Sequence, residues 1–169
     1  ASPWDVASVA VLESFDVPCY KVASACLTDH ELLIAIHRTG KAVILSTGMS
    51  TAKEIDAAYD ILFSIGCNGA WRIGSPPSLL VTTSTYPAKI EDLHLSRIPT
   101  LAMRYPDAVI GYSSHSISPW PALCAVAMGA HIVEAHLTLD RTMYGSDQAA
   151  SLEPAAFGNV RQAGSGSSG

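Results

Sequence analysis

The sequence has little charge for its size and few basic residues. Charged residues make up 15% of the 169 positions, against 49% hydrophobic ones. This balance excludes intrinsic disorder and lets the chain bury a core. There are 10 basic residues against 15 acidic ones, for a net charge of −5. We therefore expect no broad nucleic-acid binding and no binding to an anionic membrane surface, although a local basic pocket could still hold a small anion.

Long apolar runs and closely spaced cysteines are also missing. No run approaches the ~20 residues needed to cross a bilayer, and no charged-then-apolar leader begins the sequence. The four cysteines form no CxxC pair: Cys19, Cys26, Cys67 and Cys124. This spacing argues against a zinc ribbon or a thioredoxin-type site. We expect buried thiols in a reducing, cytoplasmic protein.

Short apolar runs alternate with amphipathic stretches along the chain. The runs predict strands at residues 19–23, 42–45, 79–82, 108–111 and 131–134. The stretches between and around them predict helices at residues 5–15, 29–38, 51–65, 93–104, 119–128 and 153–162. Continuous apolarity in the runs is typical of strands covered on both faces, as in parallel sheets. We read residues 1–163 as one domain and the Gly/Ser-rich residues 164–169 as a linker or an appended tail.

Local signals support several helix ends. Thr28 with Glu31 and Thr51 with Glu54 both match the capping box, in which a hydroxyl and a carboxylate satisfy free backbone N–H groups. Glycines at positions 40, 66 and 129 stand just past three of the predicted helices, where a left-handed residue often ends a helix. The Gly-, Pro- and Ser-rich residues 66–78 predict a surface loop.

The repeated helix–strand order indicates a βα-repeat protein, for which an open doubly wound sheet and a (β/α)8 barrel compete. Polar side chains follow every predicted strand, which favours the barrel, because its active site draws on the carboxyl ends of all its strands. A closed barrel needs eight strands and about 250 residues. We therefore predict a partial TIM barrel of about five parallel strands. Because an uncovered sheet edge invites pairing, we also expect the protein to be a homo-oligomer.

The residues at the strand ends resemble those of the sialic acid synthases (N-acetylneuraminate synthases) and the related spore-coat polysaccharide synthases. Six motifs occur in the same order: YKVAS at 20–24, VILSTGM at 43–49, TSTYP at 83–87, GYSSH at 111–115, EAHLTLDR at 134–141, and GSDQ followed by SLEP within 145–154. The resemblance extends to about residue 161. It implies strands four to eight of a phosphoenolpyruvate-using barrel, without the first three strands or the family's small C-terminal antifreeze-like domain.

The resemblance implies condensation of phosphoenolpyruvate with an N-acetylated aldose of the N-acetylmannosamine type. C3 of the enol attacks the aldehyde, water adds at C2, and phosphate leaves. It also implies a divalent metal cofactor, manganese or magnesium, that polarises the aldehyde oxygen. Such a reaction requires groups that hold a highly charged phosphate and carboxylate, and a group that manages proton transfer.

Each candidate residue has a role that follows from the resemblance. Lys21, in an otherwise apolar strand, would clamp phosphoenolpyruvate, and Glu134 and His136 would transfer protons. His115 would be a metal ligand. The remaining candidates would bind substrate: Ser24, Ser46, Thr47, Ser84, Tyr86, Asp147 and Gln148. Each also has a structural alternative, since a buried lysine can pair or snorkel and a loop serine can serve turn geometry.

Departures from the family pattern keep two other readings open. The resemblance places a second histidine ligand where this sequence has Val81, and valine has no lone pair to give to a metal. One alternative is therefore a catalytically inactive barrel fragment that self-associates. The other is a Schiff-base aldolase with Lys21 as the nucleophile, because burial can lower the pKa of a lysine.

Overall fold

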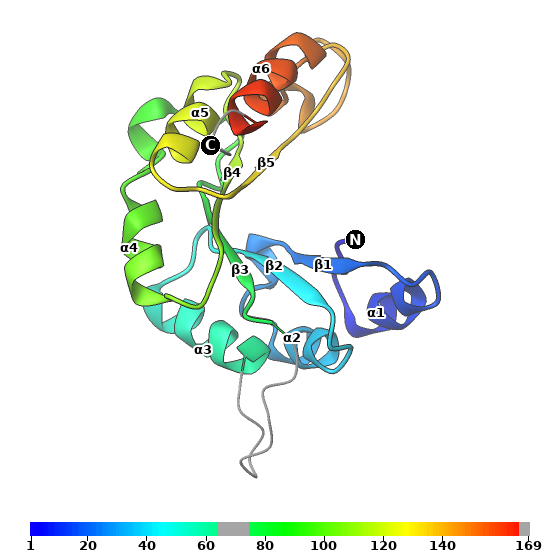
Figure 1. The fold of residues 1–169 in the computed structure, drawn as a ribbon. Helices are drawn as coiled ribbons and strands as arrows, with labels where there is room; N and C mark the ends of the chain where they lie inside the picture. Colours follow the sequence, from blue (N-terminus) through cyan, green and yellow to red (C-terminus); the bar gives the residue numbers. More distant parts are fainter. Residues whose placement is uncertain (64–74, 166–169) are drawn as a thin grey trace. The chain divides into compact units, whose positions relative to one another are not determined.

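In the computed structural model, which describes residues 1–63 and 75–165, five strands form one parallel sheet (Figure 1). The strands are β1 (Cys19–Val22), β2 (Ala42–Ser46), β3 (Ser78–Thr82), β4 (Ile110–Ser114) and β5 (Ile132–Ala135). Their order in the sheet is the order in the chain, β1-β2-β3-β4-β5. A doubly wound sheet reverses direction at a switch point, whereas the strands of a barrel follow one another. The fold is therefore a partial (β/α)8 barrel, as predicted.

Helices connect and flank the strands in the predicted places. They are α1 (Val6–Glu13), α2 (His30–His37), α3 (Ala52–Phe63), α4 (Arg97–Arg104), α5 (Trp120–Ala127) and α6 (Pro154–Ser165), with short 3₁₀ turns at Ser24–Cys26, Ile90–Asp92 and Gln148–Ala150. Helix α6 extends two residues into the predicted tail. None of the helices in the described ranges is long and apolar enough to cross a membrane.

The chain divides into two compact units, each with its own buried apolar residues. Unit 1 consists of Ala1–Leu80 and Pro106–Val109, and unit 2 of Val81–Tyr105 and Ile110–Gly169. The fully buried side chains of unit 1 include Tyr20, Leu32, Leu33, Ile36, Leu45 and Leu79. Those of unit 2 include Ile98, Tyr112, Ala122, Ala125 and Leu152.

Several element boundaries differ from those predicted, and two of the differences show where local pattern is misleading. The strand predicted at 108–111 begins at Ile110 and continues through Ser114, because its polar C-terminal residues are buried in the sheet. The helix predicted from residue 93 begins at Arg97, after a separate 3₁₀ turn at Ile90–Asp92. Pro99 lies in the first turn of α4, where its missing N–H costs nothing.

One predicted capping box is confirmed and the other is wrong. The Thr51 N–H donates to Glu54 Oε2 at 2.7 Å, and Thr51 Oγ1 accepts from the Glu54 N–H at 3.3 Å. At α2 the cap is instead Asp29, whose Oδ1 accepts from the Leu32 N–H at 3.1 Å. Gly40 and Gly129 have the positive φ expected beyond a helix end, at 69° and 98°. Gly66 and most of the predicted 66–78 loop lie outside the described residues.

The expectation of buried thiols holds for only one of the described cysteines. Cys26 is buried, Cys19 is half-buried and Cys124 is exposed on α5. Cys67 lies outside the described residues. Helix α5 (WPALCAVA) is apolar nearly all round, so its sequence does not indicate which side faces solvent.

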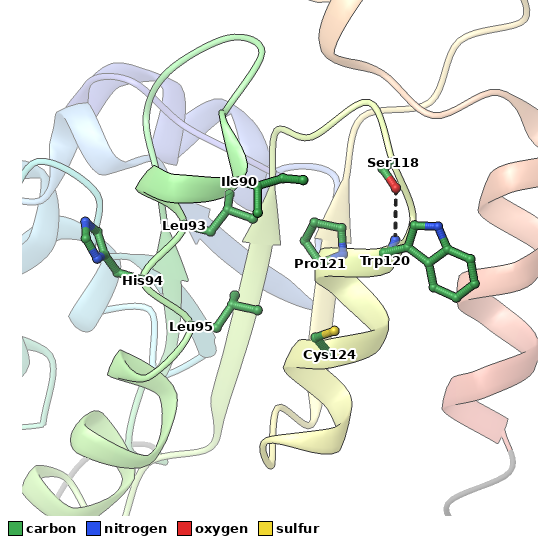
Figure 2. A pocket seen from close by; sticks show the side chains of 8 residues that line it. All are labelled: Ile90, Leu93, His94, Leu95, Ser118, Trp120, Pro121 and Cys124. Carbon is green, nitrogen blue, oxygen red and sulfur yellow. Dashed lines mark hydrogen bonds between the residues drawn. The ribbon is translucent and has the colours of Figure 1, made fainter.

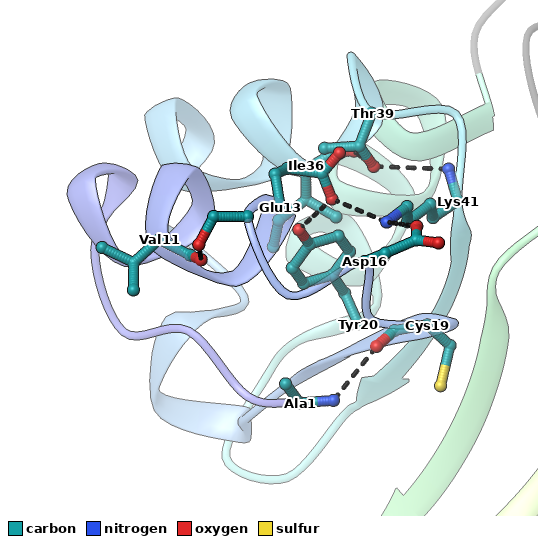
Figure 3. A network of polar contacts seen from close by, with 10 residues as sticks. Ala1, Val11, Glu13, Asp16, Cys19, Tyr20, Ile36, Thr39 and Lys41 are labelled. Atoms are coloured by element: carbon teal, nitrogen blue, oxygen red, sulfur yellow. Dashed lines mark hydrogen bonds and ion pairs between the residues drawn. The ribbon is translucent and has the colours of Figure 1, made fainter.

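A polar network ties α1 to the first two strands of unit 1 (Figure 3). The buried Tyr20 hydroxyl donates to Glu13 Oε1 at 2.5 Å. The Lys41 ammonium bridges Glu13 at 3.1 Å and Asp16 at 3.0 Å. Burial, together with the hydrogen bond to Glu13, raises the pKa of Tyr20 to about 12. The Tyr20 hydroxyl and the Lys41 ammonium in turn lower the pKa of Glu13.

The first residue also pairs with β1. The Ala1 ammonium donates to the Cys19 carbonyl at 3.1 Å, and the Lys21 N–H donates to the Ala1 carbonyl at 2.7 Å. Ser2 Oγ adds a bond to the Lys21 carbonyl at 2.9 Å. Ala1 therefore bonds to Cys19 and Lys21, the residues on either side of Tyr20, which is the pattern of two parallel strands. Ala1 lies along the edge of β1.

We expect the two predicted caps, at Thr51 and Thr28, to contribute differently to the free energy of unfolding. Thr51→Ala should lower the free energy of unfolding by about 1 kcal/mol, because it removes a side-chain acceptor from the first turn of α3. Thr28→Ala should leave it unchanged, because Asp29 caps α2. Urea denaturation of both variants tests this, and an equal loss in the two would contradict the assignment.

Stability should fall in alkaline solution through Tyr20. A phenol with a pKa near 10 in the unfolded chain and about 12 in the folded one is deprotonated first in the unfolded state. Its contribution is therefore complete below pH 10 and is lost as pH rises from 10 to 12. Urea midpoints of wild type and Tyr20→Phe should differ most near pH 8 and converge toward pH 12. A difference that stays constant with pH would refute this.

Candidate functional site

The predicted site residues fall into two groups, one in each unit, and both follow carboxyl ends of strands. The unit 1 group contains Lys21, Ser24, Ser46 and Thr47. Lys21 is half-buried in β1 and its Nζ donates to the Val22 carbonyl at 3.2 Å. Ser24 Oγ accepts from the Gly48 N–H at 3.0 Å, which joins the end of β1 to the end of β2. Thr47 Oγ1 donates to the Leu80 carbonyl at 3.0 Å.

Ser46 differs from its neighbours because its hydroxyl has no partner within the described part of the chain. The residue is 2% exposed and is the last residue of β2. An unpaired buried hydroxyl is costly, and native structures contain few of them. Ser46 thus has a donor and an acceptor available for a bound group.

The unit 2 group is built around His115, which is 5% exposed and follows β4. Its Nδ1 lies 2.7 Å from the Thr83 carbonyl oxygen. A carbonyl can only accept, so Nδ1 carries the proton, and the Nε2 of the neutral ring has a lone pair. The Tyr86 hydroxyl lies 2.9 Å from Nε2 and donates to it. The Tyr86 and His115 rings are stacked, with centroids 4.0 Å apart.

His136, just after β5, completes an aromatic cluster with these two residues. Its ring centroid lies 5.3 Å from that of His115 and 5.6 Å from that of Tyr86. Its Nδ1 is 3.7 Å from Asp147 Oδ2, on the loop that follows β5. That loop is closed at its base by a bridge between Leu137 and Leu152. The structure therefore brings Tyr86, His115, His136 and Asp147 together, as a set of predicted site residues.

Glu134 is held by a neighbouring strand. The register of β4 and β5 pairs Ser113 with Glu134, and Ser113 Oγ donates to Glu134 Oε1 at 2.8 Å. Ser113 is 2% exposed, so this bond fixes one carboxylate oxygen of a half-buried side chain. The motif GYSSH contains Ser113, but its role follows from strand register, which local sequence does not give.

The other predicted binding residues lie around this cluster. Gln148 hydrogen-bonds with the hydroxyl of Thr138 through its Oε1. Ser84 is half-buried in the loop after β3, two residues before Tyr86. The pKa of Tyr86 is raised, first by burial and then by the negative charges of Asp147 and Glu134. These two carboxylates are therefore close enough to act electrostatically on the Tyr86 hydroxyl.

A divalent metal fits the histidine pair better than it fits position 81. Val81 is buried in β3 at 2% exposure and supplies no donor. His115 and His136 are neighbours, and the bond from His115 Nδ1 to a backbone carbonyl is the support that metal-binding imidazoles usually have. Within the described ranges no group of three or more His, Cys, Asp or Glu residues could hold an ion alone. Two imidazoles are one protein ligand short of the three that catalytic zinc sites commonly have, so oxygens of water or substrate would have to complete the coordination.

A pocket of about 230 Å³ in unit 2 has a different chemistry (Figure 2). It is lined by Ile90, Leu93, His94, Leu95, Ser118, Trp120, Pro121 and Cys124. These side chains are mostly hydrocarbon, and none of them is a predicted site residue. The pocket does not suit a phosphate or a carboxylate, which need cations and several hydrogen-bond donors.

Comparison with known proteins identifies the group to which this sequence belongs. The sequence model of the NeuB family matches residues 1–165. The chain belongs to the NeuB family. It is 36% identical over 154 residues to the N,N'-diacetyllegionaminic acid synthase of Campylobacter jejuni, covering 91% of this chain and 44% of that protein.

Two solved structures agree with the fold. A spore coat polysaccharide biosynthesis protein of Bacillus subtilis matches 98% of this chain and 44% of its own, with 28% identity and a TM-score of 0.89. An N-acetylneuraminic acid (sialic acid) synthetase of Leptospira borgpetersenii matches with 36% identity and a TM-score of 0.87, covering 98% of this chain and 55% of that one. The chain thus spans about half the length of the relatives it matches.

We predict that the ring of His115 holds its proton on Nδ1 at neutral pH. In the metal-free protein, ¹⁵N NMR should show one protonated and one unprotonated nitrogen for His115, because the Thr83 carbonyl fixes the tautomer. The exposed His30 serves as a matched control, with averaged signals. Protonation of Nε2 in the neutral ring would contradict the assignment.

Proposed function

We propose that the chain carries the phosphoenolpyruvate-condensing chemistry of nonulosonic acid synthases, of which the NeuB relative from C. jejuni is named as one. The observation that carries the proposal is the cluster of Tyr86, His115, His136 and Asp147, with Glu134 two residues before His136 and so on the same face of the strand. Donors to carbonyl oxygen, a carboxylate base and a hydroxyl are what an aldol-type addition to an aldehyde requires.

The unit 1 group supports the anionic half of the reaction. The ammonium of Lys21 provides a positive charge, and the Ser24 hydroxyl, which accepts from Gly48, still has its hydrogen to donate. Thr47 would exchange its bond to the Leu80 carbonyl for one to the anion. The first turn of α3 would add backbone N–H donors. The unpaired, buried hydroxyl of Ser46 would gain a hydrogen bond from a phosphate or carboxylate oxygen. We assign these residues to phosphoenolpyruvate.

The unit 2 group supports the aldehyde half. C3 of the enol would form the new bond to the aldehyde carbon, whose oxygen takes up a proton, and water would add at C2 before phosphate leaves. A divalent ion would supply Lewis acidity toward the aldehyde oxygen, held by His115 and by His136, which would then serve as a ligand in place of the proton-transfer role that the resemblance implies for it. Glu134, which accepts a hydrogen bond from Ser113, would accept or give a proton. Asp147 would orient His136.

The sugar is assigned only by class, an N-acylated aldose. Tyr86, Ser84, Gln148 and Asp147 present hydroxyl, amide and carboxylate groups that suit a polyhydroxylated substrate. The relatives are named for different products, a diacetyllegionaminic acid in one and N-acetylneuraminic acid in another. We propose N-acetylmannosamine as the first probe, in a cytoplasmic enzyme that forms a homo-oligomer.

The test combines ligand binding with turnover. Wild-type protein, mixed with Mn²⁺, phosphoenolpyruvate and N-acetylmannosamine, should release inorganic phosphate. Lys21→Met should weaken phosphoenolpyruvate binding about 10- to 100-fold, because a charged hydrogen-bonding group is lost. Lys53→Met, at an exposed position on α3, is the matched control and should bind normally.

Other outcomes separate the alternatives. Phosphoenolpyruvate binding without phosphate release would favour an inactive fragment. Borohydride trapping of pyruvate on Lys21 would favour a Schiff-base aldolase. Normal binding by Lys21→Met would remove Lys21 from the site.

A further inference from the structure

We propose that Tyr86 is a placeholder at His115: its hydroxyl holds the Nε2 lone pair while no cation is bound and withdraws when one arrives. The inference rests on the proposed function, which assigns His115 and His136 to a divalent cation. It adds a role for Tyr86 beyond contact with the sugar, because the tyrosine then sets how tightly the cation is held.

One lone pair serves one partner at a time. The Thr83 carbonyl commits Nδ1 of His115 to donation at 2.7 Å, so Nε2 is the only ring nitrogen with a lone pair. The Tyr86 hydroxyl lies 2.9 Å from this atom. A metal–imidazole bond is about 2.0–2.1 Å long and uses the same lone pair. A cation at Nε2 and the hydrogen bond from Tyr86 therefore exclude each other.

Tyr86, rather than His115, is the residue that is free to move. His115 is 5% exposed, and its backbone carbonyl also accepts from the Ala88 N–H at 2.9 Å. Tyr86 is 48% exposed, so its ring lies beside solvent, into which it can turn. The ring lies against both imidazoles, with centroids 4.0 Å from His115 and 5.6 Å from His136. Its withdrawal would uncover both proposed ligands, and the released hydroxyl could then contact the sugar.

The test is a Mn²⁺ titration of the whole chain, followed by calorimetry and by the EPR signal of unbound Mn²⁺. Tyr86→Phe keeps the aromatic ring and loses only the hydroxyl. It should bind Mn²⁺ about three- to tenfold more tightly than wild type, the fold-change expected from removing one competing hydrogen bond. Tyr144→Phe, at a fully exposed position of the same unit, should bind as wild type does. His115→Ala should lose the site.

The outcomes separate this inference from the proposed function. Equal affinity in wild type and Tyr86→Phe, with loss in His115→Ala, would overturn the placeholder and leave the metal pair standing. Weaker binding by Tyr86→Phe would also overturn it, because the hydroxyl would then be a ligand. Absence of Mn²⁺ binding in both proteins would overturn the metal pair and the placeholder together. As a second readout, the ¹⁵N resonance of Nε2 should move toward that of a free, unbonded nitrogen in metal-free Tyr86→Phe.

Discussion

Parallel strand pairing in register is the constraint on which the candidate site depends. Parallel neighbours present their carboxyl ends at the same edge, so residues far apart in sequence become neighbours there. The pairing of Ser113 with Glu134 shows this directly, because the side chains of paired residues meet in a hydrogen bond. A shift by one residue would turn Glu134 to the other face of the sheet. The backbone ladder therefore fixes the chemistry as well as the fold.

Local pattern was enough to predict the order of the elements. Continuous apolar runs located the five strands, and consecutive strand order decided for a barrel over a doubly wound sheet. The sequence pattern gave the wrong result in two situations. In one, two neighbouring residues could both cap a helix, and in the other, the apolar run ends before the strand does. Thr28 and Asp29 are both good caps, and only the backbone shows that Asp29 is used. The apolar run before Ser113 ends at Gly111, yet β4 continues because its serines are buried and bonded.

The candidate site was predictable as a set of residues but not as a set of contacts. The motifs named His115, His136, Tyr86 and Asp147, and the resemblance implied a metal. The sequence could not show that the two histidines are neighbours, because that follows from pairing across 21 residues of chain. It also could not show that the Thr83 main chain, which carries no sequence signal, decides which nitrogen of His115 is basic.

The pairing of Ala1 with β1 has a practical consequence for handling the protein. Its amino group and carbonyl occupy the outer hydrogen-bonding positions of the first strand, beside Cys19 and Lys21. An affinity handle or fluorophore attached to Ala1 would be delivered to the sheet edge next to the proposed phosphoenolpyruvate lysine. Labels are better placed on the exposed surface of α3 or α5, where they leave that edge undisturbed.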